Sequence, residues 1–377
     1  MNNYRNAKDL KTEIEKFVRE QDDAVTAISY AVTLHLRRIE KKCNLKKDNI
    51  LVIGPTGCGK TETYRALKAI ETSLRIPIYT FGALTYSPTA AWQGTCIDNF
   101  LNKLWGESVS LAQYIAGIDG VELPDDPDDY KDKIVALMNN AIIFIDEFDK
   151  IAEKRGNTDA FCHEYQSTLL QMLEGNTYHI TLKDDQHTIP AAVNTKNMLF
   201  VLMGAFDGLQ EITSDRIKQE QHQPIGFSTA TKTKKSDAYP TTDDIVAYGF
   251  KRELIGRMTI RAFYQPLSVA EMVRIMSDCD KSAYRQFQKR FELWGHKLII
   301  DNAGLKEIAK LAESRKMGAR GLINICSDLL YKTLYQLSSV QDPMLCILTA
   351  DDIINNRPPS ISKNTDTTIH KNRSRKT

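Results

Sequence analysis

The residues best suited to chemistry form a glycine-rich stretch that follows a short apolar segment. Residues 49–53 (NILVI) predict a buried strand, and residues 54–61 (GPTGCGKT) come directly after it. This spacing matches the phosphate-binding P-loop, in which glycines let consecutive backbone N–H groups face a phosphate at the start of a helix. The residues expected to surround the phosphates are Gly54, Pro55, Thr56, Gly57, Cys58, Gly59, Lys60 and Thr61. Lys60 is expected to neutralise the β- and γ-phosphates, and the Thr61 hydroxyl to bind Mg²⁺.

A pair of acidic residues ends a second apolar segment. Residues 141–146 (AIIFID) predict another buried strand, and Glu147 follows it. A carboxylate at the carboxyl end of a parallel strand lies where ligands bind in open α/β sheets. We expect Asp146 to hold Mg²⁺ and Glu147 to orient or deprotonate the attacking water. Together with the P-loop, this pair predicts hydrolysis of ATP or GTP.

Two arginines further along the chain are candidates to complete the site. Arg257 follows a long polar stretch, and Arg320 lies at the start of a predicted helix (GARG, 318–321). Taken singly, such an arginine is more often a surface or salt-bridge residue. A guanidinium offered across a subunit boundary can, however, stabilise the charge that develops on a γ-phosphate. Arg257 is the candidate for that role, and Arg320 for a contact with the nucleotide that links two domains to its state.

The apolar pattern predicts an α/β fold with a parallel sheet. Three near-continuous apolar segments, at 49–53, 141–146 and 197–202, alternate with helical patterns. Strands without polar positions are typical of a parallel sheet that helices cover on both faces, which makes a three-layer αβα domain. After Pro266 the pattern is mostly helical, with one short strand expected near residues 298–300. This change predicts a small second domain.

The expected boundaries follow from these changes in pattern. Residues 1–266 are expected to form the large ATPase domain and residues 267–355 the small one. Residues 356–377 are expected to form a basic, disordered tail. Within the large domain, residues 105–130 are acidic and turn-rich and predict a surface insertion, and residues 215–245 predict a long exposed loop.

Composition excludes several classes of protein. The chain has 377 residues, with 42% hydrophobic and 26% charged, which is typical of a soluble globular protein. Its seven cysteines show no C-x-x-C pair, which argues against a disulfide-framed secreted module or a zinc ribbon and suits a cytoplasmic location. No apolar run approaches the ~18 residues of a membrane span. The 50 basic and 48 acidic residues argue against a large sequence-independent nucleic-acid surface.

Several segments beyond the P-loop resemble the ClpX family of AAA+ protein unfoldases, and the resemblance runs from about residue 8 to 353. These segments are FIDEFDKI (144–151), LLQMLEG (169–175), GAFDGL (204–209), IGR (255–257) and GARGL (318–322). The resemblance implies an AAA+ P-loop NTPase with a small, mostly helical C-terminal lid domain. It also implies a homo-hexameric ring with ATP at the subunit interfaces, where Arg257 acts in trans and Arg320 in cis, and loops that pull protein substrates through a central pore.

Two loops carry the partner contacts that this resemblance implies. Trp92, Gln93 and Gly94 occupy the place of the loop that grips the translocated chain, where an aromatic side chain suits van der Waals contact with varied sequences. The alternative is that Trp92 is a buried core residue. Residues 225–227, which are Ile225, Gly226 and Phe227, occupy the place of the tripeptide that docks into clefts on a ClpP-like peptidase. The alternative there is that the loop folds back onto the body.

The sequence also departs from the family pattern. It starts at the ATPase domain, so we expect no N-terminal four-cysteine zinc-binding domain. Val18 and Gln21 are the candidates for contacts with adenine, but the two residues between them differ from the family pattern. Residues 183–187 (KDDQH) replace a basic loop at the pore entrance, and their two acids disfavour an incoming α-carboxylate. We therefore expect substrates other than the usual C-terminal tags.

Three functions remain open at this stage. The pattern favours an ATP-dependent protein unfoldase and translocase that delivers proteins to a ClpP-like peptidase. The alternative is an ATP-dependent remodeller of protein complexes that has no peptidase partner. A nucleic-acid motor or loader with the same ATPase core is less favoured, because no nucleic-acid-binding module can be recognised.

Overall fold

The computed structural model describes residues 6–85, 95–124, 127–152, 160–183, 188–222, 239–279 and 281–364. Backbone contacts divide the chain into two units. The first comprises Met1–Gly54 and Lys60–Tyr264, and the second comprises Pro55–Gly59 and Gln265–Thr377.

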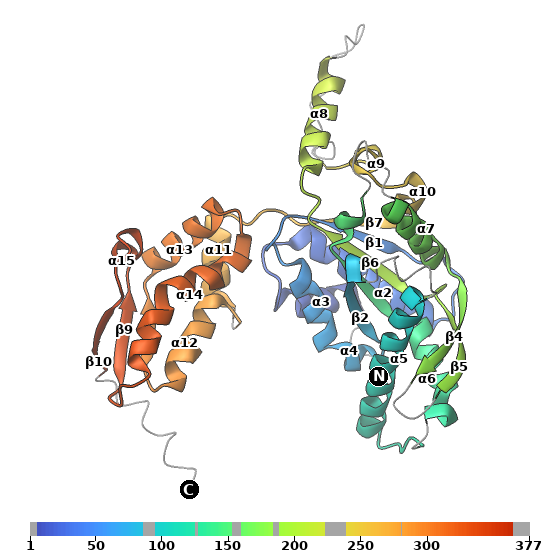
Figure 1. Ribbon diagram of the computed structural model, residues 1–377, viewed down its shortest axis with the longest axis horizontal. Coiled ribbons are helices and arrows are strands. Elements are labelled where there is room, and N and C mark those ends of the chain that lie inside the picture. The colour runs from blue at the N-terminus through green and yellow to red at the C-terminus, as the bar shows by residue number, and fades with distance from the viewer. Residues whose placement is uncertain are drawn as a thin grey trace. The chain divides into compact units, whose positions relative to one another are not determined.

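A five-stranded parallel sheet forms the centre of the first unit, in the order β2-β3-β6-β1-β7 (Figure 1). Its strands are β1 (Asn49–Ile53), β2 (Ile78–Gly82), β3 (Ile142–Asp146), β6 (Leu199–Gly204) and β7 (Met258–Phe263). All residues of β1 and β6 are buried, so both faces of the sheet are covered. The predicted α/β fold with a parallel sheet is confirmed.

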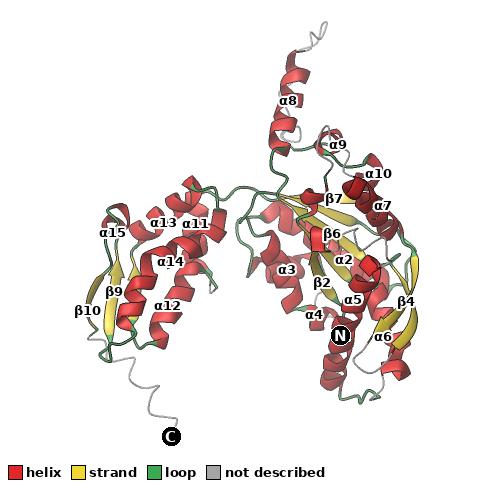
Figure 2. Ribbon diagram, viewed as in Figure 1, coloured by secondary structure: helices red, strands yellow, loops and turns green. Residues whose placement is uncertain are grey.

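The other elements of this unit are mostly helices; several of them cover the sheet, whereas α8 projects away from it (Figure 2). They are α1 (Ala7–Glu15), α2 (Asp22–Glu40), α3 (Lys60–Ala69), α4 (Glu71–Leu74), α5 (Thr95–Asp119), α6 (Lys131–Asn139), α7 (Ala160–Glu174), α8 (Leu209–His222), α9 (Thr242–Tyr248) and α10 (Arg252–Ile255). An antiparallel hairpin, β4 (Thr177–Lys183) with β5 (Thr188–Asn194), packs against α5 and α6. Among the described residues, no helix is both long and apolar enough to cross a membrane.

The second unit combines helices with a three-stranded sheet in the order β10-β9-β8. Its elements are α11 (Val269–Asp278), α12 (Ala283–Leu293), β8 (Lys297–Ile300), α13 (Asn302–Ser314), α14 (Gly318–Leu337), β9 (Met344–Leu348), α15 (Ala350–Ile354) and β10 (Ser360–Lys363). Phe287, Phe291 and Leu330 are among the buried side chains that form its separate core. Capping boxes at Ser268 and Thr349 start two of these helices.

Parts of three segments that were expected to be irregular have regular secondary structure. Residues 105–119 continue α5, because the burial of Trp105 and Leu111 outweighs the low helix propensity of Gly106 and Gly117.

The predicted 215–245 loop also contains regular structure, since α8 extends to His222 and α9 begins at Thr242. The expected tail begins with a strand, because residues 360–363 pair with β9.

Candidate nucleotide-binding site

The P-loop starts at a glycine held by two neighbouring strands. The Gly54 N–H donates to Gly204 O at the end of β6 (3.3 Å), and the Tyr264 N–H beyond β7 donates to Ile53 O (2.8 Å). A Cβ atom at Gly54 would collide with Tyr264, so only glycine fits there. Lys60 begins α3, and its ammonium group donates to Gly54 O across the loop. If a bound phosphate replaced Gly54 O as the acceptor for Lys60, it would contact both the Lys60 ammonium group and the N-terminus of α3.

The Pro55–Gly59 turn groups with the second unit by its contacts. Gly57 and Gly59 have φ values of 78° and 109°, which favour glycine. The buried Cys58 thiol donates to Pro55 O (2.9 Å), and the Ala319 N–H donates to Gly57 O (2.9 Å). The loop therefore has the glycine-dependent turn that a phosphate cradle needs.

The acid pair lies at the same edge of the sheet as Gly54. Asp146 is the last residue of β3 and is half-buried, whereas Glu147 is exposed and adopts the left-handed conformation (φ 55°). The Glu147 N–H donates to Asp146 Oδ1 (2.8 Å). Because β6 separates β3 from β1, the two strand ends lie roughly 10 Å apart. That spacing suits a carboxylate that holds a metal ion beside a phosphate.

A third acid, Asp149, was not among the predicted site residues. It holds the segment after Glu147 against the end of β6. Asp149 is 6% exposed and accepts a hydrogen bond from the Ala205 N–H (3.2 Å), just beyond β6. Burial raises the pKa of Tyr248 to about 12, and the nearby carboxylates of Asp149 and Asp207 add to this effect. The only signal in the sequence was a third acid three residues after Asp146. Asp149 therefore positions the acid pair relative to β6.

The two candidates for adenine contacts lie in the turn between α1 and α2. Val18 is 3% exposed and Gln21 is 5% exposed. The Val25 N–H donates to Gln21 O (2.9 Å) at the start of α2, and α1 packs against α3. The hairpin of α1 and α2 thus lies beside the helix that begins with Lys60.

Arg257 lies at the opposite end of the parallel strands, where they begin. It precedes β7, whose first residue pairs with Asn49 at the start of β1, and Asn49 Nδ2 donates to Arg257 O (3.2 Å). The guanidinium is about half exposed and forms an ion pair with Glu174 at the end of α7. Within one chain, Arg257 is thus separated from Lys60 and Asp146 by the length of a strand, roughly 16 Å.

Three predicted features of the site remain. The structure describes Arg320, but the other two are loops that lie outside the described residues. Arg320 is exposed in the first turn of α14, next to the Ala319 that binds the P-loop backbone. The two loop predictions lie outside the described residues: Trp92, Gln93 and Gly94 in one, and Ile225, Gly226 and Phe227 in the other. Residues 184–187 of the acidic replacement loop also lie outside them.

The fold and the site are those of a P-loop nucleotide-binding domain, in which the P-loop and an acid pair lie at the carboxyl ends of parallel strands. Residues 128–261, which include the acid pair and Arg257, are similar to the AAA domain (Cdc48 subfamily).

The chain is similar over most of its length to ClpX, the ATP-binding subunit of the ATP-dependent Clp protease. It is 29% identical to ClpX of Borrelia duttonii over 365 residues, which cover 92% of this chain and 78% of the relative. It is also 29% identical to ClpX of Bacteroides thetaiotaomicron over 350 residues, which cover 88% and 77%.

Proposed function

We propose that this protein is the ATP-driven subunit of a ring-shaped, hexameric protein unfoldase and translocase. The observation that carries the proposal is the placement of the charged groups. Lys60 and the Asp146–Glu147 pair lie at one edge of the parallel sheet, and Arg257 lies at the other. In a ring, the surface of one copy that carries Arg257 can pack against the surface of the next copy that carries Lys60 and the acid pair. Such packing completes the site at every interface.

Each group of the site has a distinct chemical role in this proposal. The P-loop amides and Lys60 bind the phosphates, and Thr61 and Asp146 hold Mg²⁺, which shields the charge of the β- and γ-phosphates. Glu147 orients the attacking water and accepts its proton. Val18 and Gln21 border the adenine, and Arg320 links the small domain to the bound nucleotide.

The neighbouring copy supplies Arg257 in this proposal. Its pair with Glu174 is exposed, so moving the guanidinium to a phosphate costs little.

The loops outside the described residues carry the mechanical part of the proposal. Trp92, with Gln93 and Gly94, grips the substrate chain in the pore, and Ile225, Gly226 and Phe227 dock to a ClpP-like peptidase. The support for this partner is the similarity to ClpX proteins, which are ATP-binding subunits of a Clp protease.

An assay with a stable, tagged fluorescent protein tests the proposal in the presence and absence of a ClpP-type peptidase. We expect Glu147→Gln to retain ATP binding but to lower the hydrolysis rate at least ~100-fold and abolish unfolding. Lys60→Ala should lose nucleotide binding. Glu313→Gln, which changes an exposed carboxylate on α13, is the matched control and should behave like the wild type.

The outcomes separate the candidate functions. Hydrolysis of ATP by the wild type without unfolding of any tagged reporter would contradict the proposal. Unfolding that never leads to degradation would remove the peptidase and favour a remodeller.

A further inference from the structure

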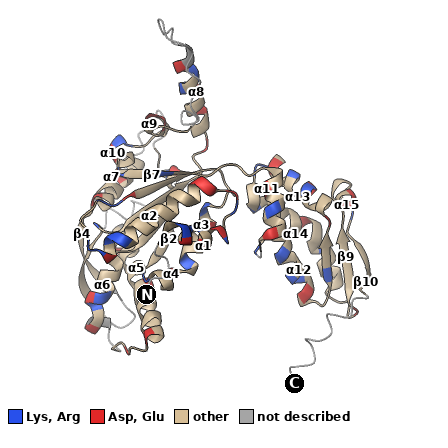
Figure 3. Cartoon of the chain, turned by 180° about the vertical axis from the view of Figure 1, so that it is seen from behind, with Lys and Arg blue, Asp and Glu red and all other residues tan. Residues whose placement is uncertain are grey.

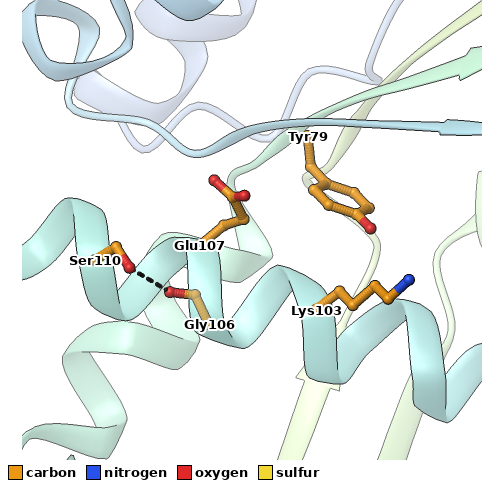
Figure 4. Close-up of a pocket in the computed structure, with 5 residues that line it drawn as sticks. All are labelled: Tyr79, Lys103, Gly106, Glu107 and Ser110. Atoms are coloured by element: carbon orange, nitrogen blue, oxygen red, sulfur yellow. Dashed lines mark hydrogen bonds between the residues drawn. The ribbon is translucent and has the colours of Figure 1, made fainter.

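Two groups of polar side chains in the first unit lie outside the nucleotide-binding site. One group lines a cavity of about 370 Å³ between α5 and the edge strand β2 (Figure 4). There Glu107 accepts a hydrogen bond from Lys68 (2.8 Å). The Ser110 hydroxyl donates to Gly106 O (3.0 Å), so both side chains are already bonded within the chain. The other group surrounds Gln166, which is fully buried in the middle of α7.

The Gln166 amide makes hydrogen bonds to three backbone groups. Its Nε2 donates to Ile151 O (2.9 Å) and to Gly249 O (3.1 Å), and its Oε1 accepts from the Lys251 N–H (2.9 Å). Two of these partners are carbonyl oxygens and the third is an N–H, so only one orientation of the amide satisfies all three. An apolar side chain of similar size would leave the three backbone groups without these partners.

These three groups belong to two segments that are far apart in the sequence. We call residues 148–151, which follow the acid pair, the acid-pair turn, and its last residue is Ile151. We call residues 249–257 the arginine segment, because it contains the other two partners and ends at Arg257. Within one chain, the Gln166 side chain thus joins the turn beside the acid pair to the segment that carries the candidate trans-acting arginine.

Aromatic packing joins the same two segments. Phe148, which is fully buried, directly follows Glu147, and its ring stacks on the ring of Phe250 with centroids 4.6 Å apart. Phe206, beyond β6, packs on both rings at centroid distances of 6.3 and 5.8 Å. This apolar cluster keeps the two segments in contact, whereas the directional hydrogen bonds of Gln166 fix how they are aligned.

The short helix α10 connects the partners of Gln166 to Arg257. Lys251 precedes α10, and the Ile255 N–H donates to Lys251 O (3.1 Å). The Arg257 N–H donates to Leu254 O (3.1 Å), and the side chains of Leu254 and Ile255 are buried. The backbone position of Lys251 therefore determines where Arg257 begins.

The helix α7 contacts the arginine segment in two further places. The Lys251 ammonium group donates to His163 O (2.9 Å) and to Ser167 Oγ (2.6 Å). The last residue of α7, Glu174, forms an ion pair with the Arg257 guanidinium. The helix therefore holds both the beginning of the arginine segment and the side chain at its end.

We propose that Gln166 is a positioning residue for ATP hydrolysis at the site of the neighbouring copy. It aligns the arginine segment with the acid-pair turn of its own chain, and this alignment sets where Arg257 meets the γ-phosphate that the next copy binds. Because a small misplacement of a catalytic group lowers the rate strongly, the effect falls on kcat and spares nucleotide binding. This role rests on the proposed ring, in which Arg257 acts in trans.

ATPase assays of Gln166→Leu on the full chain test this role, since leucine is similar in size but makes no hydrogen bonds. We expect kcat to fall at least about tenfold, while KM for ATP changes less than about twofold. Gln171→Leu is the matched control, because it makes the same change at an exposed position of α7, and it should hydrolyse ATP like the wild type.

Mixed rings show which half of the site Gln166 positions. A Gln166→Leu copy keeps its acid pair, so a correctly placed arginine from a Glu147→Gln copy should complete its site. In a random mixture of equal amounts, about one quarter of the interfaces have this pairing, and activity should rise to about that fraction of the wild type. A mixture of Gln166→Leu with Arg257→Ala should stay close to the activity of its components, because its only arginine is misplaced.

A second variant keeps the test decisive if Gln166→Leu does not fold. Lys251→Met removes the ammonium contacts with α7 at a half-buried position and should lower kcat by a smaller factor than Gln166→Leu. Of its two mixtures, the one with Glu147→Gln should again be more active than the one with Arg257→Ala.

Two results would overturn the positioning role. One is a wild-type kcat in Gln166→Leu. The other is greater activity in the Arg257→Ala mixture than in the Glu147→Gln mixture, because that order would place the defect in the acid pair of the same chain.

A mixture of Arg257→Ala with Glu147→Gln separates this inference from the proposed function. If it recovers no activity, Arg257 does not act in trans, and the role of Gln166 is contradicted with it. If it recovers activity but the two Gln166→Leu mixtures are equally active, only the positioning role is contradicted.

Discussion

At the scale of single residues, His35 has an unusual environment in the first unit. It is 2% exposed on α2, and its Nε2 lies 2.8 Å from Asn140 O, which requires this nitrogen to carry the proton. Burial lowers the pKa of His35 to about 4, and the nearby cations Arg38 and Lys47 act in the same direction. The side chain is therefore neutral in the folded protein at pH 7 and above.

This shift predicts a loss of stability in mild acid. In the unfolded chain, His35 has an ordinary pKa of about 6.5. As the pH falls from about 6.5 to 4, the unfolded state binds a proton that the folded state does not, so the free energy of unfolding falls by up to about 3 kcal/mol. His35→Gln should remove most of this pH dependence while keeping a donor for Asn140 O. Urea unfolding of both proteins between pH 4.5 and 7.5, followed by circular dichroism, measures it, and parallel curves would contradict the explanation.

At the scale of elements, a buried carboxylate connects α8 to α9. Asp244 is 3% exposed, and the Arg216 guanidinium donates to both of its oxygens (3.0 and 3.1 Å). Burial acts to raise the pKa of Asp244, but hydrogen bonds from Thr241 and Arg216 outweigh it and hold the pKa below its usual value. Charges of both signs lie along α8 (Figure 3), so this pair can be compared with an exposed one on the same helix.

We predict different effects for two basic residues of α8. Arg216→Met leaves the Asp244 carboxylate buried without its cation and should lower the free energy of unfolding by about 1–3 kcal/mol. Lys218 pairs with Asp215 at 3.4 Å, and both side chains are more than two thirds exposed, so Lys218→Met should change stability by less than about 0.5 kcal/mol. Urea unfolding midpoints give both values, and equal effects would show that Arg216 does not stabilise the connection between the helices.

The burial of each strand explains which strands could be predicted from the sequence. The strands β1, β3 and β6 have long apolar runs because they are buried on both faces. The edge strands β2 and β7 contain partly exposed positions such as Thr80 and Arg261, which interrupt that pattern. The strand β10 is exposed along its whole length, so only its pairing with β9 defines it. Such pairing depends on distant residues, and a local pattern does not contain it.

The features of the candidate site also differ in whether the sequence could predict them. Lys60 and Asp146 could be predicted because their motifs are continuous in sequence. The contact of Asp149 with Ala205 could not, because it joins residues 56 positions apart that meet only when β6 lies beside β3.

At the scale of the whole molecule, the position of Arg257 constrains the proposed mechanism of hydrolysis. The arginine lies at the amino edge of the sheet, and the phosphate cradle begins at the carboxyl edge of the same sheet. Roughly 16 Å of strand separates the two, which is longer than an arginine side chain. In the proposed ring, an isolated chain therefore has an incomplete site, and activity should depend on assembly.

A mixing experiment with two inactive variants tests this dependence. An Arg257→Ala subunit keeps its acid pair but supplies no guanidinium, whereas a Glu147→Gln subunit supplies the guanidinium but cannot hydrolyse its own nucleotide. Each variant alone should have little ATPase activity. In a randomly mixed ring with equal amounts, about one quarter of the interfaces join an intact acid pair to an intact Arg257, so activity should return to about that fraction of the wild type.

The mixture also distinguishes the alternative arrangement directly. If Arg257 acted on the nucleotide of its own chain, no pairing of these subunits could complete a site, and the mixture would stay as inactive as its components. Mixing Arg257→Ala with Lys60→Ala is the matched control, because it pairs an intact acid pair with an intact arginine in the same way while removing nucleotide binding from the donor subunit. Recovery of ATPase activity in both mixtures would show that Arg257 acts across the interface whether or not its own subunit holds nucleotide. Recovery only with Glu147→Gln would show that the subunit that supplies Arg257 must itself bind nucleotide.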